Sequence, residues 1–158
     1  MYVMKLKYLI APFLLAAAAL CGCQETAVQL VGEGYFQRFA PLMDRRLCCA
    51  RVLDLYAGSG QLGIEALSRG AARCVFLDEN RDAVNIVMKN CKNCGVFDRS
   101  RVNIGEAARY LSACHEQFDL VLLDPPFRGG TLEKILPGVE KCVAPGGIVL
   151  CESETGLV

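Results

Sequence analysis

From residue 51 onward, short apolar runs alternate with stretches in which apolar residues recur every three or four positions. The short runs are apolar at consecutive positions, which is typical of strands buried on both faces of a parallel sheet. The longer stretches have one apolar face, as amphipathic helices do. In the stretch 81–93, for example, Val84, Val87, Met88 and Cys91 share a face.

This pattern predicts an α/β fold. Strands are expected at 51–56, 73–78, 101–104, 118–124 and 146–152, and helices at 61–70, 81–93, 106–114 and 131–143. Gly70 ends the first helix, and the last helix is expected to be interrupted at Pro137–Gly138. Because consecutive strands are joined through helices, they must run parallel, which predicts a doubly wound, Rossmann-like parallel sheet.

The first 50 residues follow a different pattern. Lys5 and Lys7 precede an apolar run over 8–20 and then small residues around cysteine, which is the layout of an export signal. The run is too short to span a bilayer comfortably. "LCGC" at 20–23 resembles a bacterial lipoprotein box with Cys23 as the lipidated residue, and a buried amino-terminal helix is the alternative. Residues 24–50 are expected to be an irregular or helical lead-in, with helical turns over 35–49 broken at Pro41.

Charge does not decide what the chain binds. With 17 basic and 17 acidic residues the net charge is zero, whereas stand-alone nucleic-acid binders usually have a basic excess. The local basic clusters, Arg45–Arg46–Arg51 and Arg99–Arg101, are interpreted as solvated faces. The composition therefore neither supports nor excludes RNA.

The ten cysteines are interpreted as reduced and structural. Cys74 and Cys151 lie in apolar runs, and "CKNC" at 91–94 closes a predicted helix rather than opening one, unlike a thioredoxin motif. A second pair at zinc-finger spacing is missing and the only histidine is His115, so no metal site is expected. Reduced cysteines predict a cytoplasmic protein, with a membrane-tethered lipoprotein as the alternative.

A glycine-rich stretch, "DLYAGSGQLG" (54–63), follows the first predicted strand and opens the first helix. Gly58, Gly60 and Gly63 satisfy G-x-G-x-x-G, and Asp78 lies twenty residues after Gly58, as in a dinucleotide fingerprint. An NAD-dependent oxidoreductase is therefore one interpretation. Asp54 favours S-adenosylmethionine instead, because a carboxylate can accept from the methionine ammonium but would repel a pyrophosphate.

Two further acids lie at or just after the ends of predicted strands. Asp78 can accept from both ribose hydroxyls of either cofactor. Glu106 can accept from the adenine amino group, or it is an acid stabilised at a helix amino terminus. The candidate cofactor-binding residues are Asp54, Tyr56, Ala57, Gly58, Ser59, Gly60, Asp78 and Glu106.

The stretch "LVLLDPPFRGG" (120–130) ends a buried strand with a DPPF motif. Asp124 and the Pro125 carbonyl could each accept one hydrogen of an exocyclic amine and draw its lone pair toward a methyl donor. Pro126 keeps a competing N–H out of this corner, and Phe127 can stack on an extruded base. Asp124, Pro125, Pro126 and Phe127 are therefore the candidate catalytic residues.

Together, "VLDLYAGSGQLGIEALSRGA" and "FDLVLLDPPF" resemble the RsmD-type bacterial methyltransferases, which modify guanine N2 in small-subunit (16S) ribosomal RNA. The resemblance covers about 51–156. It implies a methyltransferase core over 51–158, S-adenosyl-L-methionine bound by Asp54–Gly60, Asp78 and Glu106, and catalysis by Asp124–Phe127. It also implies rRNA methylation, with ribosomal RNA or a small-subunit particle as partner.

Both ends depart from this family. Residues 1–50 do not match its amino-terminal hairpin, and the chain ends at Val158, before two further strands that the family has. We therefore expect a sheet truncated to about five strands, with its fourth or fifth strand an exposed apolar edge, and an amino-terminal segment that is foreign or chimeric. Two alternatives stay open beside NAD chemistry: a DNA adenine-N6 methyltransferase, and an inactive or lipid-tethered fragment.

Overall fold

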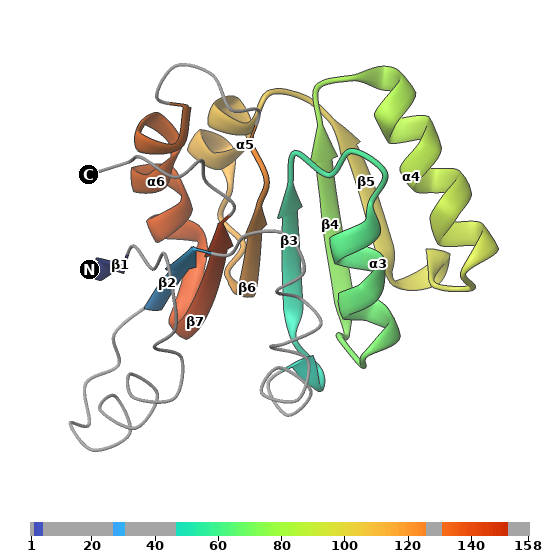
Figure 1. Cartoon of the computed structure of the whole chain (residues 1–158), viewed down its shortest axis with the longest axis horizontal. Coiled ribbons are helices and arrows are strands. Elements are labelled where there is room, and N and C mark those ends of the chain that lie inside the picture. The colour runs from blue at the N-terminus through green and yellow to red at the C-terminus, as the bar shows by residue number, and fades with distance from the viewer. Residues whose placement is uncertain (1, 5–26, 31–46, 126–130, 152–158) are drawn as a thin grey trace.

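The computed structural model describes residues 2–4, 27–30, 47–125 and 131–151, which build a parallel sheet with helices on both faces (Figure 1). The sequence predictions for the apolar run over 8–20, for Cys23 and for the turns around Pro41 concern residues outside these ranges. Within the described residues, no helix is long and apolar enough to cross a membrane.

The sheet has the order β1-β2-β7-β6-β3-β4-β5, and every neighbouring pair is parallel. The five predicted strands are confirmed with small shifts of their ends. The strands are β1 (Tyr2–Met4), β2 (Ala27–Leu30), β3 (Arg51–Leu55), β4 (Arg73–Asp78), β5 (Ser100–Ile104), β6 (Phe118–Leu123) and β7 (Val143–Cys151).

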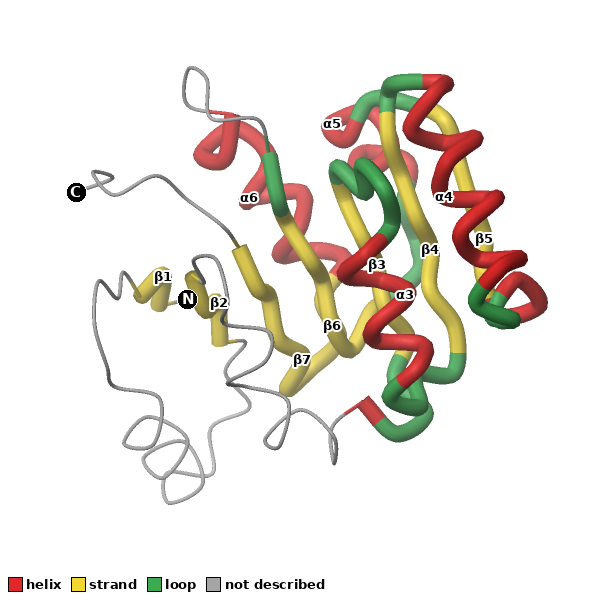
Figure 2. The backbone as a smooth tube through the Cα atoms, turned by 45° about the vertical axis from the view of Figure 1, so that its right-hand side comes forward, coloured by secondary structure: helices red, strands yellow, loops and turns green. Residues whose placement is uncertain are grey.

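The helices cover the two faces in pairs, as a doubly wound fold requires (Figure 2). The helices are α3 (Gln61–Ser68), α4 (Arg81–Asn93), α5 (Ala107–Ala113) and α6 (Thr131–Cys142), with a 3-10 turn η1 (Phe97–Arg99). Residues of α3 and α4 pack with Val52 and Phe76 on one face of the sheet. Residues of α5 and α6 pack with Leu53 and Leu55 on the other. The alternation along β3 thus divides the core into two layers, one on each side of the sheet.

Helix α4 shows how closely pattern and structure agree. It spans the predicted 81–93, it begins after Asn80, whose side chain accepts from the Asp82 N–H, and Val84, Val87 and Cys91 are buried. Cys94 caps its end, so the "CKNC" stretch closes a helix as predicted. Cys74 and Cys151 are fully buried, which confirms their interpretation as core residues.

The predicted interruption at Pro137–Gly138 is wrong, because α6 is continuous from Thr131 to Cys142. Proline in a helix interior loses one hydrogen bond, but Ile135 and Val139 on either side are buried against the sheet and hold the helix. Gly138 serves close packing, since a Cβ there would lie 3.0 Å from the Leu111 Cβ of α5.

The expected exposed apolar edge is also wrong. β2 pairs with β7 from Ala27↔Ile148 to Leu30↔Cys151, and β1 pairs with β2. The sheet therefore has seven strands rather than about five, and part of the lead-in 24–50 is a strand rather than irregular or helical. This pairing joins segments far apart in sequence, which the local hydrophobic pattern does not reveal.

Candidate functional site

The order of connections reverses at β3, which lies between β4 and β6. The chain leaves β3 for α3 on one face and leaves β6 for α6 on the other, and in open α/β sheets ligands bind in the crevice at such a point. The register sets Leu55 opposite both Leu77 and Leu123. The segments that follow these three strands therefore start side by side at the upper edge of the sheet in Figure 1.

The glycine loop after β3 has an unusual backbone. Tyr56, Gly58 and Gly60 have positive φ angles of 63°, 56° and 78°. Glycine adopts this conformation freely, whereas a tyrosine there is strained, and such strain concentrates at functional sites. The loop is held from both sides, because Ala57 N–H donates to Leu77 O (3.0 Å) and Gly60 N–H donates to Ala57 O (2.7 Å).

Asp78 ties three loops together at this edge. Its Oδ2 accepts from the Gly58 N–H and its Oδ1 from the Asn80 N–H, both at 2.9 Å. Its carbonyl accepts from Gly105 N–H, also at 2.9 Å. The predicted cofactor residues Gly58 and Asp78 are therefore in direct contact, and the loop after β5 joins them.

Asp54 lies beneath the loop and is only 2% exposed. Its Oδ2 accepts from the Gly63 N–H (2.9 Å) in the first turn of α3. Burial raises the pKa of Asp54 to about 7; the Gly63 hydrogen bond opposes the shift, and the negative charges of Asp124 and Asp78 add to it. The sequence predicts that this carboxylate contacts a ligand, and the structure shows that it binds the first turn of α3.

The sequence predicts Gly63 only as the third glycine of the G-x-G-x-x-G pattern. A Cβ there would lie 2.3 Å from Phe76 Cε1 and 2.7 Å from Cys74 Sγ. The third glycine of G-x-G-x-x-G permits close packing of helix on strand, and that spacing was the signal for it. Without a side chain at this position, α3 approaches β4 closely enough for its backbone to reach Asp54.

Three further residues stand at the same edge. Glu106 occupies the position that begins α5, is exposed, and makes no capping hydrogen bond with its side chain. Ile104, the last residue of β5, pairs with Asp78 and is 51% exposed, an unusual exposure for a large apolar side chain. Asn90 of α4 donates from Nδ2 to the Ser59 carbonyl (2.9 Å) and so fixes the tip of the glycine loop. Neither Ile104 nor Asn90 was predicted, because only the fold brings them to this edge.

The structure describes two of the four predicted catalytic residues, Asp124 and Pro125. Asp124 is exposed directly after β6, and Pro125 is buried. Pro126 and Phe127 lie outside the described residues. Asp124 nonetheless belongs to the group around the switch point, because its charge acts on Asp54.

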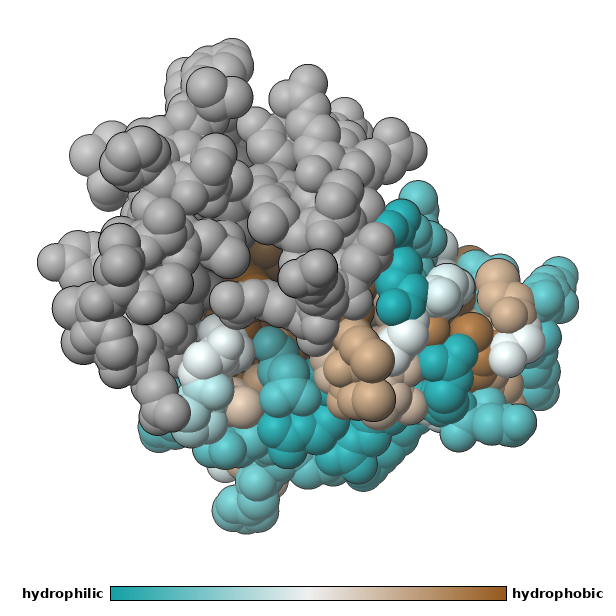
Figure 3. All heavy atoms as spheres, turned by 90° about the horizontal axis from the view of Figure 1, so that it is seen from below, coloured by the Kyte–Doolittle hydropathy of each residue, from teal (hydrophilic) through white to brown (hydrophobic). Residues whose placement is uncertain are grey.

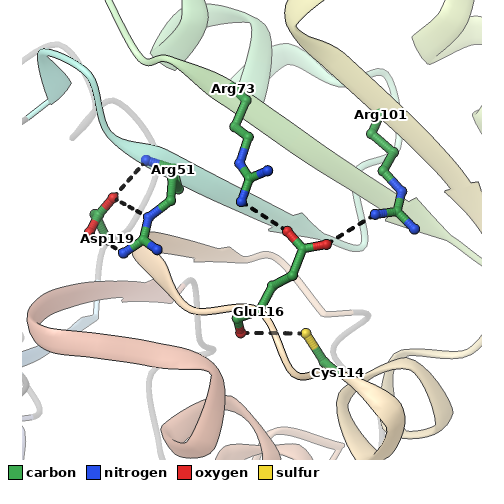
Figure 4. Close-up of polar contacts among 6 residues, drawn as sticks. All are labelled: Arg51, Arg73, Arg101, Cys114, Glu116 and Asp119. Carbon is green, nitrogen blue, oxygen red and sulfur yellow. Dashed lines mark hydrogen bonds and ion pairs between the residues drawn. The ribbon is translucent and has the colours of Figure 1, made fainter.

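The opposite edge of the sheet carries a set of ion pairs (Figure 4). Arg51 donates to both carboxylate oxygens of Asp119, at 3.0 Å each, and Glu116 bridges Arg73 (3.1 Å) and Arg101 (3.0 Å). Arg51 and Arg101 keep 39% and 64% of their side chains exposed, which agrees with their interpretation as solvated faces, and each also pairs with an acid near the start of β6. Figure 3 views this edge from below, and many hydrophilic residues lie on its described part.

Among the described residues there is no group of three or more histidine, cysteine, aspartate or glutamate side chains that could hold a metal ion. The polar groups at the carboxyl ends of the strands are carboxylates and backbone N–H groups. That donor set suits an organic ligand with a sugar and a cationic group.

The strand order, the glycine loop and the acids at the carboxyl ends of β3 and β4 define a Rossmann-like fold of the methyltransferase class. Solved structures agree: "Putative methyltransferase yhhF from Escherichia coli" superimposes with a TM-score of 0.69 at 32% identity, covering 80% of this chain and 70% of that one. This chain belongs to the family described as "Conserved hypothetical protein 95", whose model matches residues 29–157. The match begins upstream of Arg51, so it includes part of the segment that the sequence reasoning set apart.

Two curated relatives are named as ribosomal RNA methyltransferases. The chain is 36% identical over 114 residues to "Putative rRNA methyltransferase YlbH" of Bacillus subtilis, covering 70% of this chain and 60% of the relative. It is 33% identical over 126 residues to "Ribosomal RNA small subunit methyltransferase D" of Escherichia coli, covering 78% and 61%. The chain thus spans about three fifths of the length of these relatives.

Proposed function

We propose that this chain is an S-adenosyl-L-methionine-dependent methyltransferase that modifies the exocyclic amine of a nucleobase, with guanine N2 of small-subunit ribosomal RNA as the target. One observation carries the proposal. Asp124 and Pro125 follow β6, the glycine loop follows β3, and these two strands are neighbours, so both segments lie at the same edge of the sheet. A group that accepts amine hydrogens therefore stands beside a loop built for a nucleoside cofactor.

The charge at the switch point favours this cofactor over NAD. Asp54, Asp78 and Asp124 lie close enough that the last two raise the pKa of the first. Their joint negative potential attracts a sulfonium and an ammonium and repels a pyrophosphate. S-adenosyl-L-methionine, when bound, supplies a methyl group on a positively charged sulfur.

The residues that would hold the cofactor come from three loops. In the glycine loop over 56–60, the positive φ angles at Gly58 and Gly60 suit residues without side chains, so a cofactor can approach the backbone closely. Asp78 accepts from ribose hydroxyls, in exchange for or beside its present bond to Gly58. Exposed Ile104 offers an apolar surface beside Asp78, and Glu106 accepts from the adenine amine.

The target amine is activated by the DPPF motif. Its lone pair is delocalised into the base ring, so the free amine is a poor nucleophile. Asp124 and the Pro125 carbonyl each accept one amine hydrogen and direct the lone pair toward the methyl carbon; rate enhancement then comes mainly from positioning. Phe127 stacks on the extruded base, and Pro126 stiffens the corner.

The names of the relatives support RNA as the substrate class, and they support a ribosomal RNA or small-subunit particle as partner. A cytoplasmic location follows from such a substrate. If the segment ending at Cys23 is a lipoprotein signal, the chain is instead tethered to a membrane.

The test is incorporation of tritiated methyl groups into small-subunit particles lacking the modification, compared with duplex DNA, followed by identification of the methylated nucleoside. We expect label in the particles only, as N2-methylguanosine. Label in DNA as N6-methyladenine would mean that the chain methylates an exocyclic amine, as proposed, but that its target is adenine in DNA. Label in neither substrate, from protein that binds the cofactor, would contradict catalysis by this chain.

A further inference from the structure

Two adjacent thiols meet on the surface just before β3. Cys48 and Cys49 are both exposed free cysteines, and their Sγ atoms are 3.8 Å apart. The proposed methyl transfer uses neither of them. The preceding residue, Leu47, is 1% exposed and anchors the turn in the core.

The turn holds this pair in a fixed conformation. Cys49 has a φ of 65°, a left-handed value that is strained for cysteine. Its N–H donates to Gly70 O (2.9 Å), Ala50 N–H donates to Leu47 O (2.9 Å), and Ala72 N–H donates to Ala50 O (2.8 Å). Because these bonds fix the backbone on both sides, the two thiols are preorganised on one side of the turn.

The geometry favours a bridging ligand over a disulfide. Adjacent Cα atoms across a trans peptide are about 3.8 Å apart, whereas disulfide-linked Cα atoms usually lie about 4.4–6.8 Å apart. Closing the sulfurs to bonding distance would distort the turn, but an atom placed between them accepts the present separation. The proximity of Cys48 raises the pKa of the Cys49 thiol, as expected for two thiols that compete to ionise.

The number of donors limits which atom can bridge them. A structural zinc ion needs four ligands, and within the described ranges no group of three metal-binding side chains exists. Two sulfurs are enough for a soft centre that already carries another substituent, and the Cys48–Cys49 pair supplies two.

We propose that Cys48 and Cys49 form a binding site for monosubstituted trivalent arsenicals. The two thiols condense with R–As=O: two S–H bonds and the As=O bond break, two As–S bonds form, and the oxygen leaves as water with both protons. Arsenic stays trivalent, so no oxidant or reductant is required. The site lies at the start of β3, at the opposite end of that strand from the glycine loop, so it is independent of the proposed function.

The test uses the reduced full chain and phenylarsine oxide, with intact mass spectrometry and peptide mapping of the adduct. The first equivalent should map to the peptide that contains Cys48 and Cys49, survive a monothiol wash and be removed by 2,3-dimercaptopropanol. Cys48→Ser and Cys49→Ser should each weaken binding by about a hundredfold or more, since the second sulfur binds at high effective concentration. Cys94→Ser, which changes another exposed thiol, should bind as the unmodified chain does.

Mapping of the first equivalent to any other cysteines would overturn the proposal. Undiminished binding by both Cys48→Ser and Cys49→Ser would do the same. Circular dichroism of the variants separates lost binding from lost folding, and mapping on the unmodified chain does not depend on any variant.

Discussion

Carboxylates lie at both edges of the sheet, but they have different partners at each edge. At the amino-terminal edge, Asp119 and Glu116 pair with arginine side chains. At the carboxyl-terminal edge, Asp54 and Asp78 accept from backbone N–H groups of the loops. Arg51 lowers the pKa of Asp119, whereas burial and neighbouring acids raise that of Asp54.

This contrast separates a structural role from a functional one. Ion pairs at the amino-terminal edge cancel charge between strands and leave little for a ligand. Acids gathered at the carboxyl-terminal edge keep a negative potential in the crevice at the switch point, where a cationic cofactor and an amine are attracted. A buried acid with a raised pKa, such as Asp54, marks the crevice as a candidate functional site.

The largest effect is expected at Asp124, the acid that we propose accepts a hydrogen of the target amine. Asp124→Ala should reduce methyl transfer about a hundredfold or more, because positioning of the amine is lost, while cofactor binding measured by calorimetry falls far less, because Asp54 and Asp78 remain. Asp98→Ala is the matched control, because it removes an exposed acid in η1. Equal turnover by the two variants would remove the proposed distinction between the edges.

Gly63→Ala should destabilise the fold by about 2 to 3 kcal/mol through overpacking. The new Cβ would meet Phe76 and Cys74 and push α3 away from Asp54. Gly105→Ala is the control in a neighbouring loop, because its nearest contact would be Leu77 Cδ1 at an ordinary 3.8 Å. Urea denaturation measures both, and a Gly63→Ala loss no larger than that of Gly105→Ala would contradict the close packing.

Asp54 should make stability fall as pH rises. Its folded pKa of about 7 lies above the ordinary aspartate value of 3.8, so the folded state binds the proton more tightly than the unfolded chain does. The stabilisation is complete below the unfolded pKa and is lost as pH rises through the folded one. Asp54→Asn keeps an acceptor for Gly63 but does not titrate. Between pH 5 and 7, the free energy of unfolding of the unmodified chain should therefore fall by about 2 kcal/mol more than that of the variant. Identical urea-midpoint profiles for the variant and the unmodified chain would show that Asp54 does not titrate in this range.

The smallest effect is expected at the amino-terminal edge, with the opposite sign. Asp119 has a lowered pKa, so its stabilisation is present above the unfolded pKa and lost as pH falls through the folded one. Its side chain is 40% exposed, so Arg51→Met should lower the free energy of unfolding at neutral pH by no more than about 1 kcal/mol. The difference in urea midpoint should shrink in high salt because of screening. A large, salt-independent loss would mean that this edge is more than a screened ion pair.

The sequence predicted what short-range pattern encodes. Apolar runs and helical periodicity located the five core strands and α4, because burial imposes those periods. The glycine spacing located the loop, and "DPPF" located the acid after β6. The partners of these residues were beyond reach, because the Asp54–Gly63 and Arg51–Asp119 bonds and the β2–β7 pairing depend on tertiary contacts. Pro137 misled for the same reason, since packing on both sides of it outweighed its local preference.

The most direct test of the central claim is calorimetric titration of the folded, monodisperse full chain with S-adenosyl-L-methionine, with NAD as the comparison ligand. Micromolar binding of S-adenosyl-L-methionine alone, weakened by Asp78→Ala, is the predicted result. Binding of NAD instead, or of neither ligand, would contradict the claim that the acids around β3 form a site for a cationic cofactor.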